Sequence, residues 1–207
     1  MAHDMNSLHI AILGFDGVEA LDFAGPFEVL TTAARVHRRL HPDAAPWSEV
    51  RCVAASSVPV VARAGLRILP DMAFEEASRW GIDLLVVPGG VVDAPLQSAP
   101  TLEWIRTTAN SARITASVCT GAFLLAASGV IRNERVTTHW EDVADLRAQF
   151  PSLHVQTDVR WVDEGRVVTS AGISAGIDMS LHLVERLGGE ALATRTARQM
   201  DFAWTRH

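Results

Sequence analysis

The stretch 113-RITASVCTGAFLLAASG-129 changes character at its centre. An apolar, β-branched run up to residue 118, typical of a strand, gives way to an Ala- and Leu-rich run that favours a helix. Cys119 therefore lies at a strand-to-helix junction. The first N–H groups of a helix and its dipole favour the thiolate, the nucleophilic form of cysteine. The pattern predicts a reactive thiol, with a buried small hydrophobic residue as the alternative.

The rest of the chain alternates short apolar runs with longer amphipathic runs, the pattern of βαβ units. Strands are predicted over 8–13, 49–54, 83–87, 135–138, 153–156, 159–162 and 167–170, with a small hairpin of 58–61 and 66–69. Helices are predicted over 23–40, from about 100, and over 140–150, 173–187 and 190–204. The fold class is α/β with a mainly parallel sheet. Sites in such sheets lie beyond the carboxyl ends of the strands, where Gly89, Gly90 and Cys119 would meet.

Length and composition indicate one domain over residues 1–207, because 48% hydrophobic residues supply one sizeable core. The formal charge is −6 and no block of like charge occurs, so the chain lacks the basic footprint of nucleic-acid or membrane binding. Small molecules or proteins are the expected partners. The first apolar run is one strand long and no positive segment precedes it, so no leader or membrane span is expected. A cytoplasmic location follows, with Cys52 and Cys119 as free thiols.

Five segments carry a resemblance to a known family. They are GFDGVEALDFAGPFEVL (14–30), LLVVPGG (84–90), SVCTGAFLLAASG (117–129), RVTTHW (135–140) and TSAGISAGID (169–178). In this order, and over nearly the whole chain, they resemble the DJ-1/PfpI superfamily, also called ThiJ/PfpI or class I glutamine amidotransferase-like. The most similar branches are isocyanide hydratase and the sensor-like domain that precedes an AraC-type DNA-binding module. The resemblance implies a flavodoxin-like three-layer sandwich, a homodimer and a cysteine on a strained elbow turn.

Asp22 and Thr120 are the residues that the resemblance connects with Cys119. Alone, an Asp at the start of a helix is typical of an N-cap. In the superfamily an acidic residue of this segment reaches the cysteine sulfur, which implies that Asp22 is a general acid and base. Thr120 stands where peptidase-like members carry a histidine, so no adjacent base supports a cysteine protease. Thr120 would instead supply a hydroxyl and a backbone N–H.

Residues after the buried strand 83–87 are candidates for holding a substrate. Gly89, Gly90 and Val91 offer backbone N–H groups that could stabilise developing negative charge, although two glycines are also common in a plain tight turn. The resemblance places His139, twenty residues after Cys119, near the thiol as an indirect partner, with a helix cap as the alternative. Ser174 is predicted to face the same pocket.

No metal or other cofactor is expected. The eight histidines are scattered, no CxxC occurs, and GFDGVEA lacks the third glycine of a dinucleotide loop. Three functions stay open. The first is a hydratase that adds water to an isocyanide through Cys119, or a related hydrolase or glyoxalase-like enzyme using the same residues. The second is a ligand-sensing or regulatory domain, and the third is a sensor based on oxidation of Cys119.

Overall fold

The computed structural model describes residues 7–206 and contains a seven-stranded sheet in the order β10-β11-β7-β6-β1-β2-β5. Neighbouring strands are parallel except β10 and β11. The strands are β1 (Leu8–Leu13), β2 (Ser48–Ala54), β5 (Met72–Ala73), β6 (Leu84–Val87), β7 (Ile114–Val118), β10 (Trp161–Asp163) and β11 (Val167–Ser170). The mainly parallel α/β sheet predicted from the sequence is confirmed.

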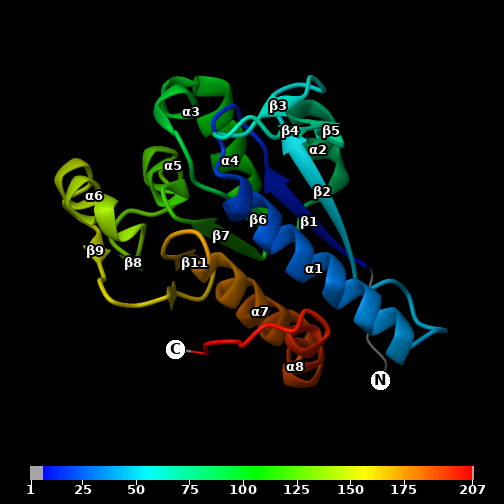
Figure 1. Cartoon of the computed structure of the whole chain (residues 1–207). Helices are drawn as coiled ribbons and strands as arrows, with labels where there is room; N and C mark the ends of the chain where they lie inside the picture. Colours follow the sequence, from blue (N-terminus) through cyan, green and yellow to red (C-terminus); the bar gives the residue numbers. More distant parts are fainter. Residues whose placement is uncertain (1–6, 207) are drawn as a thin grey trace.

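Helices cover both faces of the sheet (Figure 1). On one face α1 (Ala20–Leu40), α7 (Ala175–Gly188) and α8 (Glu190–Gln199) pack against one another. The other face carries α2 (Phe74–Trp80), α3 (Asp93–Gln97), α4 (Ala99–Ser111) and α5 (Gly121–Ala127). The arrangement is the expected three-layer sandwich, and its buried apolar side chains form one cluster.

Two small pairs of strands flank the sandwich. The antiparallel hairpin of β3 (Val60–Val61) and β4 (Arg67–Ile68) follows β2, as predicted. The parallel pair β8 (Arg135–Val136) and β9 (His154–Val155) encloses a 3-10 turn, Trp140–Asp142, and α6 (Val143–Gln149). Figure 1 shows α6 standing away from the sheet, next to α5. The segments that connect the two strands of each pair supply side chains to the cavity described below.

The register of the central strands gathers their carboxyl ends at one edge. Ile12 pairs with Val86, and Val87 pairs with Ser117, so β1, β6 and β7 end nearly level. These strands are almost wholly buried, which explains why they read as continuous apolar runs in the sequence. The loops that leave this edge form the candidate site.

Several predicted element bounds differ from the structure. Helix α1 begins at Ala20, three residues before the predicted start, so Asp22 lies in its first turn and is not the N-cap. The expected helix 190–204 ends at Gln199, because Asp178 binds the chain that follows through the Thr205 N–H at 2.7 Å. Helices α2 and α3 were not predicted. Both are short, and Pro95 lies inside α3.

Residues 1–6, on which the expectation of no leader partly rests, and His207 lie outside the described residues. Within residues 7–206, no helix combines the length and the hydropathy that crossing a membrane requires.

Candidate active site

Cys119 lies on a left-handed turn between β7 and α5, with φ of 56°. A left-handed conformation is costly for a residue with a side chain and persists only where its surroundings enforce it. Here the Cys119 N–H donates to the Ser170 carbonyl at 3.1 Å, and the Thr138 hydroxyl donates to the Cys119 carbonyl at 2.9 Å. An added Cβ on Gly121 would overlap the Val87 carbonyl oxygen, so only glycine lets α5 start this close to β6. The elbow implied by the resemblance is therefore present.

Asp22 lies beneath the thiol and is completely buried, with 0% of its surface exposed. Its Oδ2 accepts the Gly89 N–H at 3.2 Å, while its Oδ1 has no hydrogen-bond partner. Burial raises the pKa of Asp22 to about 7, and the hydrogen bonds from the Gly89 N–H and the Cys119 thiol lower it only partly. Near neutral pH this carboxyl can both take and give a proton. The structure brings Asp22 together with the Cys119 thiol, and the role of Asp22 as general acid and base stays a prediction.

Cys119 is 7% exposed, and burial raises its pKa to about 12. The negative charges of Asp22 and Asp142 raise the pKa further, whereas the backbone N–H and hydroxyl of Thr120 lower it. The expected effect of the helix end, which favours the thiolate, is present but is opposed by burial and by neighbouring carboxyls. The first helical turn does act in the expected direction, but desolvation and two carboxyls outweigh it.

Thr120 connects the elbow to the loop after β6. Its Oγ1 accepts the Gly90 N–H at 2.8 Å and donates to the Gly90 carbonyl at 2.9 Å. Because a hydroxyl has one proton, the bond to the Gly90 carbonyl competes with donation to the Cys119 sulfur. Thr120 is placed to change donor direction when the sulfur becomes charged.

The three amides predicted to hold substrate are already engaged. Gly89 donates to Asp22, Gly90 donates to Thr120, and Val91 donates to the Gly17 carbonyl at 2.9 Å. The oxyanion role expected of these three N–H groups is therefore not supported by the structure. The physical reason is a bridge between Val18 and Gly90, which ties the loop after β6 to the loop after β1. Gly90 and Val91 do line the cavity, whereas Gly89 does not.

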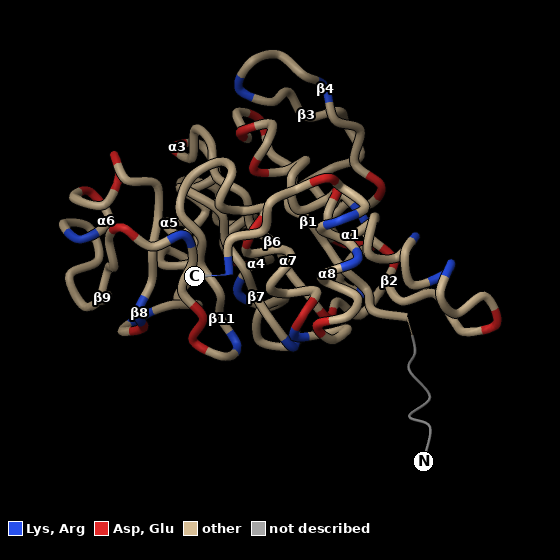
Figure 2. Tube along the Cα trace, turned by 60° about the horizontal axis from the view of Figure 1, so that its bottom comes forward, with Lys and Arg blue, Asp and Glu red and all other residues tan. Residues whose placement is uncertain are grey.

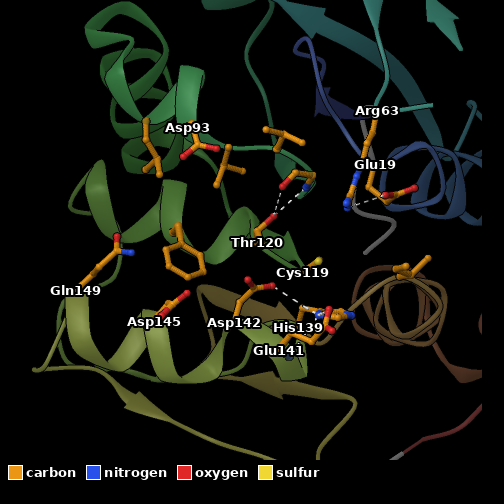
Figure 3. Close-up of a pocket in the computed structure, with 16 residues that line it drawn as sticks. Glu19, Arg63, Asp93, Cys119, Thr120, His139, Glu141, Asp142, Asp145 and Gln149 are labelled. Carbon is orange, nitrogen blue, oxygen red and sulfur yellow. Dashed lines mark hydrogen bonds and ion pairs between the residues drawn. The ribbon is translucent and has the colours of Figure 1, made fainter. Parts of the chain in front are cut away.

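Above Cys119 lies a cavity of about 390 Å³ (Figure 3). Its charged or titratable lining residues, besides Cys119, are Glu19, Arg63, Asp93, His139, Glu141, Asp142 and Asp145. The remaining lining residues are Gly90, Val91, Val92, Leu96, Thr120, Phe123, Gln149 and Ile173. Figure 3 shows Cys119 and Thr120 near the centre, with acidic side chains entering from several elements.

His139 belongs to this cavity, whereas Ser174 does not. The His139 Nδ1 accepts the Glu141 N–H at 3.4 Å, which is the capping role given as its alternative, and it lies 3.6 Å from Asp142. Ser174 lines a neighbouring cavity of about 650 Å³ and binds Arg160 at 3.3 Å. Its predicted place in the cysteine pocket is not what the structure shows, since Ser174 lines only the neighbouring cavity, whereas His139 and Ile173 border both.

Sequence reasoning missed Arg63, Asp142 and Asp145. Arg63 follows the hairpin strand β3 and pairs with Glu19 at 3.8 Å. Asp142 and Asp145 are three residues apart at the start of α6, a spacing that places them on one helix face. That spacing was the available signal, but nothing in the sequence says which surface the face meets. Among residues 7–206, no group of three or more His, Cys, Asp or Glu side chains is arranged to hold a metal ion.

The fold and the site together define a class, the flavodoxin-like cysteine-elbow proteins. In this class a thiol lies on a left-handed turn after a central parallel strand and is paired with a buried carboxyl. Residues 8–186 match the DJ-1/PfpI family, and the chain belongs to that family. The resemblance noted in the sequence is thus confirmed.

Individual relatives differ in their described activities. The isonitrile hydratase of Pseudomonas putida is 35% identical over 95% of this chain and 79% of that protein. The HTH-type transcriptional regulator CdhR of Pseudomonas aeruginosa is 29% identical over 88% of this chain, which spans 52% of the regulator. Among solved structures, a ThiJ/PfpI family protein from Pseudomonas syringae has a TM-score of 0.83 and 27% identity, covering 97% of this chain and 77% of that one.

Proposed function

We propose that this protein is a small-molecule hydratase of the isocyanide hydratase type, with Cys119 as nucleophile and Asp22 as general acid and base. The observation that carries the proposal is the isolation of this pair. Asp22 has no exposed surface and does not line the cavity, so the Cys119 sulfur connects the carboxyl to whatever occupies the cavity. Such a pair suits a reaction in which one atom of the substrate accepts both the sulfur and a proton.

An isocyanide, R–N≡C, is a substrate of this kind. The thiol passes its proton to Asp22, the sulfur attacks the terminal carbon, and Asp22 returns the proton to that carbon, giving the thioimidate R–N=CH–S–Cys. Water then adds its hydroxyl to the carbon and its proton to the nitrogen. The C–S bond breaks as the carbonyl forms, and the hydroxyl proton returns to the sulfur through Asp22. The product is the N-formamide R–NH–CHO.

Thr120 supports the same sequence of steps. When the thiol loses its proton, the Thr120 hydroxyl can turn from the Gly90 carbonyl toward the sulfur, where its donation stabilises the negative charge. This rearrangement needs no movement of the backbone. The proposal uses no metal and no cofactor, and it expects a cytoplasmic protein that acts on a small molecule.

Turnover of a simple aryl isocyanide tests the proposal, with formamide measured by chromatography. We expect Cys119→Ala to abolish formamide production and Asp22→Asn to lower kcat at least about a hundredfold, as for loss of a general acid and base. Cys52→Ala is the matched control, because Cys52 is the other buried thiol and does not line this cavity. Turnover that survives Cys119→Ala, or no turnover at all, overturns the proposal.

A ligand-sensing role is the second candidate, favoured by the similarity to the regulator CdhR. A sensor would bind a small molecule at the cavity without changing it. If no isocyanide or small carbonyl is converted, yet a ligand raises the Tm of both the native chain and Cys119→Ala, the sensing role replaces the hydratase. Peroxide treatment followed by intact-mass measurement tests the oxidation sensor, which requires a stable gain of two oxygens on Cys119.

A further inference from the structure

The cavity over Cys119 is lined by far more negative than positive charge. Its five carboxyls come from three separate parts of the chain, and Arg63 is its single arginine. That arginine already pairs with Glu19 at 3.8 Å. The carboxyls are Glu19, Asp93, Glu141, Asp142 and Asp145. An anionic ligand would meet a negative field throughout most of this cavity.

Two of these carboxyls have no counter-charge. Within residues 7–206, neither Asp93 nor Asp145 takes part in an ion pair or a side-chain hydrogen bond, whereas the other three cavity carboxyls each lie within 4 Å of Arg63 or His139. Asp93 begins α3 and Asp145 lies in the first turn of α6, so they belong to different walls. Figure 3 shows Asp93 above and Asp145 below on the left of the view, with Cys119 to the right of both. Both are exposed, which places them at the mouth of the cavity.

The same cavity also has apolar walls. Val92, Leu96 and Phe123 line the same cavity, and Phe123 is almost fully buried. A hydrated metal ion makes no favourable contact with apolar walls. An alkylated ammonium group can pair with the carboxyls and also contact apolar and aromatic side chains.

We propose that the substrate class of this site is a cationic small electrophile, whose reactive carbon meets Cys119 and whose ammonium group lies between Asp93 and Asp145. The reactive group rests on the proposed function, whereas the charge preference does not. The cavity thereby divides into two parts, a reactive base around Cys119 and Thr120 and a charge-selecting mouth formed by α3 and α6.

Three aryl isocyanides that differ only in the para substituent test the preference during turnover: trimethylammoniomethyl, methyl and carboxylate. We expect kcat/KM to be at least about tenfold higher for the cation than for the neutral compound, and lowest for the anion. The double variant Asp93→Asn, Asp145→Asn should lower the ratio of kcat/KM for the cation to kcat/KM for the neutral compound at least about fivefold. The matched control, Glu75→Gln with Glu103→Gln, removes the same charge from exposed helix positions outside the cavity and should retain the preference.

A second measurement does not depend on turnover. In a Cys52→Ala background, two methanethiosulfonates, one ending in ammonium and one in sulfonate, are reacted with Cys119, and their rate ratio is divided by the ratio for a free small thiol. We expect a corrected ratio of about ten or more, falling toward one in the Asp93→Asn, Asp145→Asn variant.

The two measurements separate the two proposals. If no isocyanide is converted but the corrected ratio is high, the hydratase fails and the charge preference stands. If isocyanides are converted equally whatever their charge and the corrected ratio is near one, the hydratase stands and the charge preference is overturned. A preference that the control variant abolishes as completely as the cavity variant also overturns it, because the whole net charge would then be its source.

Discussion

Asp22 and Cys119 share a buried environment that keeps protons on both groups more firmly than water would. The site is thus not a permanently charged nucleophile waiting for substrate. Its reactivity depends on transfer of the thiol proton to the carboxyl, at the moment when the substrate can accept the sulfur. The Asp22 carboxyl therefore lowers the reactivity of the resting Cys119 thiol, yet it is required for turnover.

Replacement of Asp22 by Asn should therefore have opposite effects on two measurements. Loss of the carboxyl charge lowers the pKa of Cys119, so we expect iodoacetamide to alkylate the Cys119 thiol about three- to tenfold faster at pH 8. Isocyanide turnover should fall at the same time. Glu28→Gln, an exposed position of the same helix, should change neither rate. Slower alkylation in Asp22→Asn would contradict the described electrostatics.

Asp22 should also make the folded state less stable as pH rises. Its pKa is about 7 in the fold against an ordinary 3.8, so between these values the folded chain binds more protons than the unfolded chain. The free energy of unfolding should fall by about 3 kcal/mol from pH 4 to pH 7 relative to Asp22→Asn, and the difference should level off only above about pH 8, once the folded carboxyl is fully ionised. Urea unfolding of both proteins over this range measures it. Parallel stability curves would show that Asp22 is not buried as described.

The position of Cys119 could be predicted from the sequence, because it directly follows a recognisable central strand whose carboxyl end lies at the shared edge of the sheet. The approach of Asp22 to Cys119 was implied only by the family resemblance, since local pattern alone gives Asp22 as a helix cap. Whether an amide is free to bind substrate depends on distant partners. The Val91 N–H is taken by Gly17, which lies 74 residues earlier in the chain, and no local pattern records that contact.

At the scale of elements, the junction of β7 and α5 was predictable because strongly β-forming residues meet strongly helix-forming ones there. The same reasoning missed α2 and α3, because segments of seven and five residues give too few turns for a clear helical period. It also could not place α6 over the cavity, since that position depends on the β8 and β9 pairing. The acidic mouth was therefore outside what the sequence alone could predict.

Gly121→Ala tests the close approach of α5 to β6. Since the added Cβ would overlap the Val87 carbonyl oxygen and that oxygen belongs to a central strand, we expect a loss of about 3 kcal/mol or more in the free energy of unfolding. Gly65→Ala is the comparison. Gly65 has φ of 93° with open space around it, so only conformational strain of about 1 kcal/mol should appear. Equal losses in the two variants would show that α5 can move away from β6.

At the scale of the whole molecule, charges of both signs are interspersed along the trace (Figure 2). The net charge of −6 is thus spread widely, and the concentration of carboxyls around one cavity is a local feature. This contrast is why variants that change net charge elsewhere serve as controls for the cavity.

A homodimer, which the family resemblance implies, stays a prediction. The hairpin around β3 and β4 exposes Val58, Leu66 and Leu69, each more than half accessible in the single chain. Apolar side chains gathered in this way are typical of a surface that is covered in an assembly. We expect light scattering after size exclusion to give twice the chain mass of 22.4 kDa at micromolar concentration. A monomeric mass under these conditions would contradict the prediction.

The left-handed backbone at Cys119 affects which substitutions of residue 119 evolution would favour. Glycine and asparagine adopt this conformation more readily than cysteine, so either would relax the turn. Only a need for sulfur opposes that gain in stability. In a lineage that kept the cavity for recognition alone, we expect residue 119 to be lost first. The residue found there in each descendant would then record whether the ancestral chemistry is still under selection.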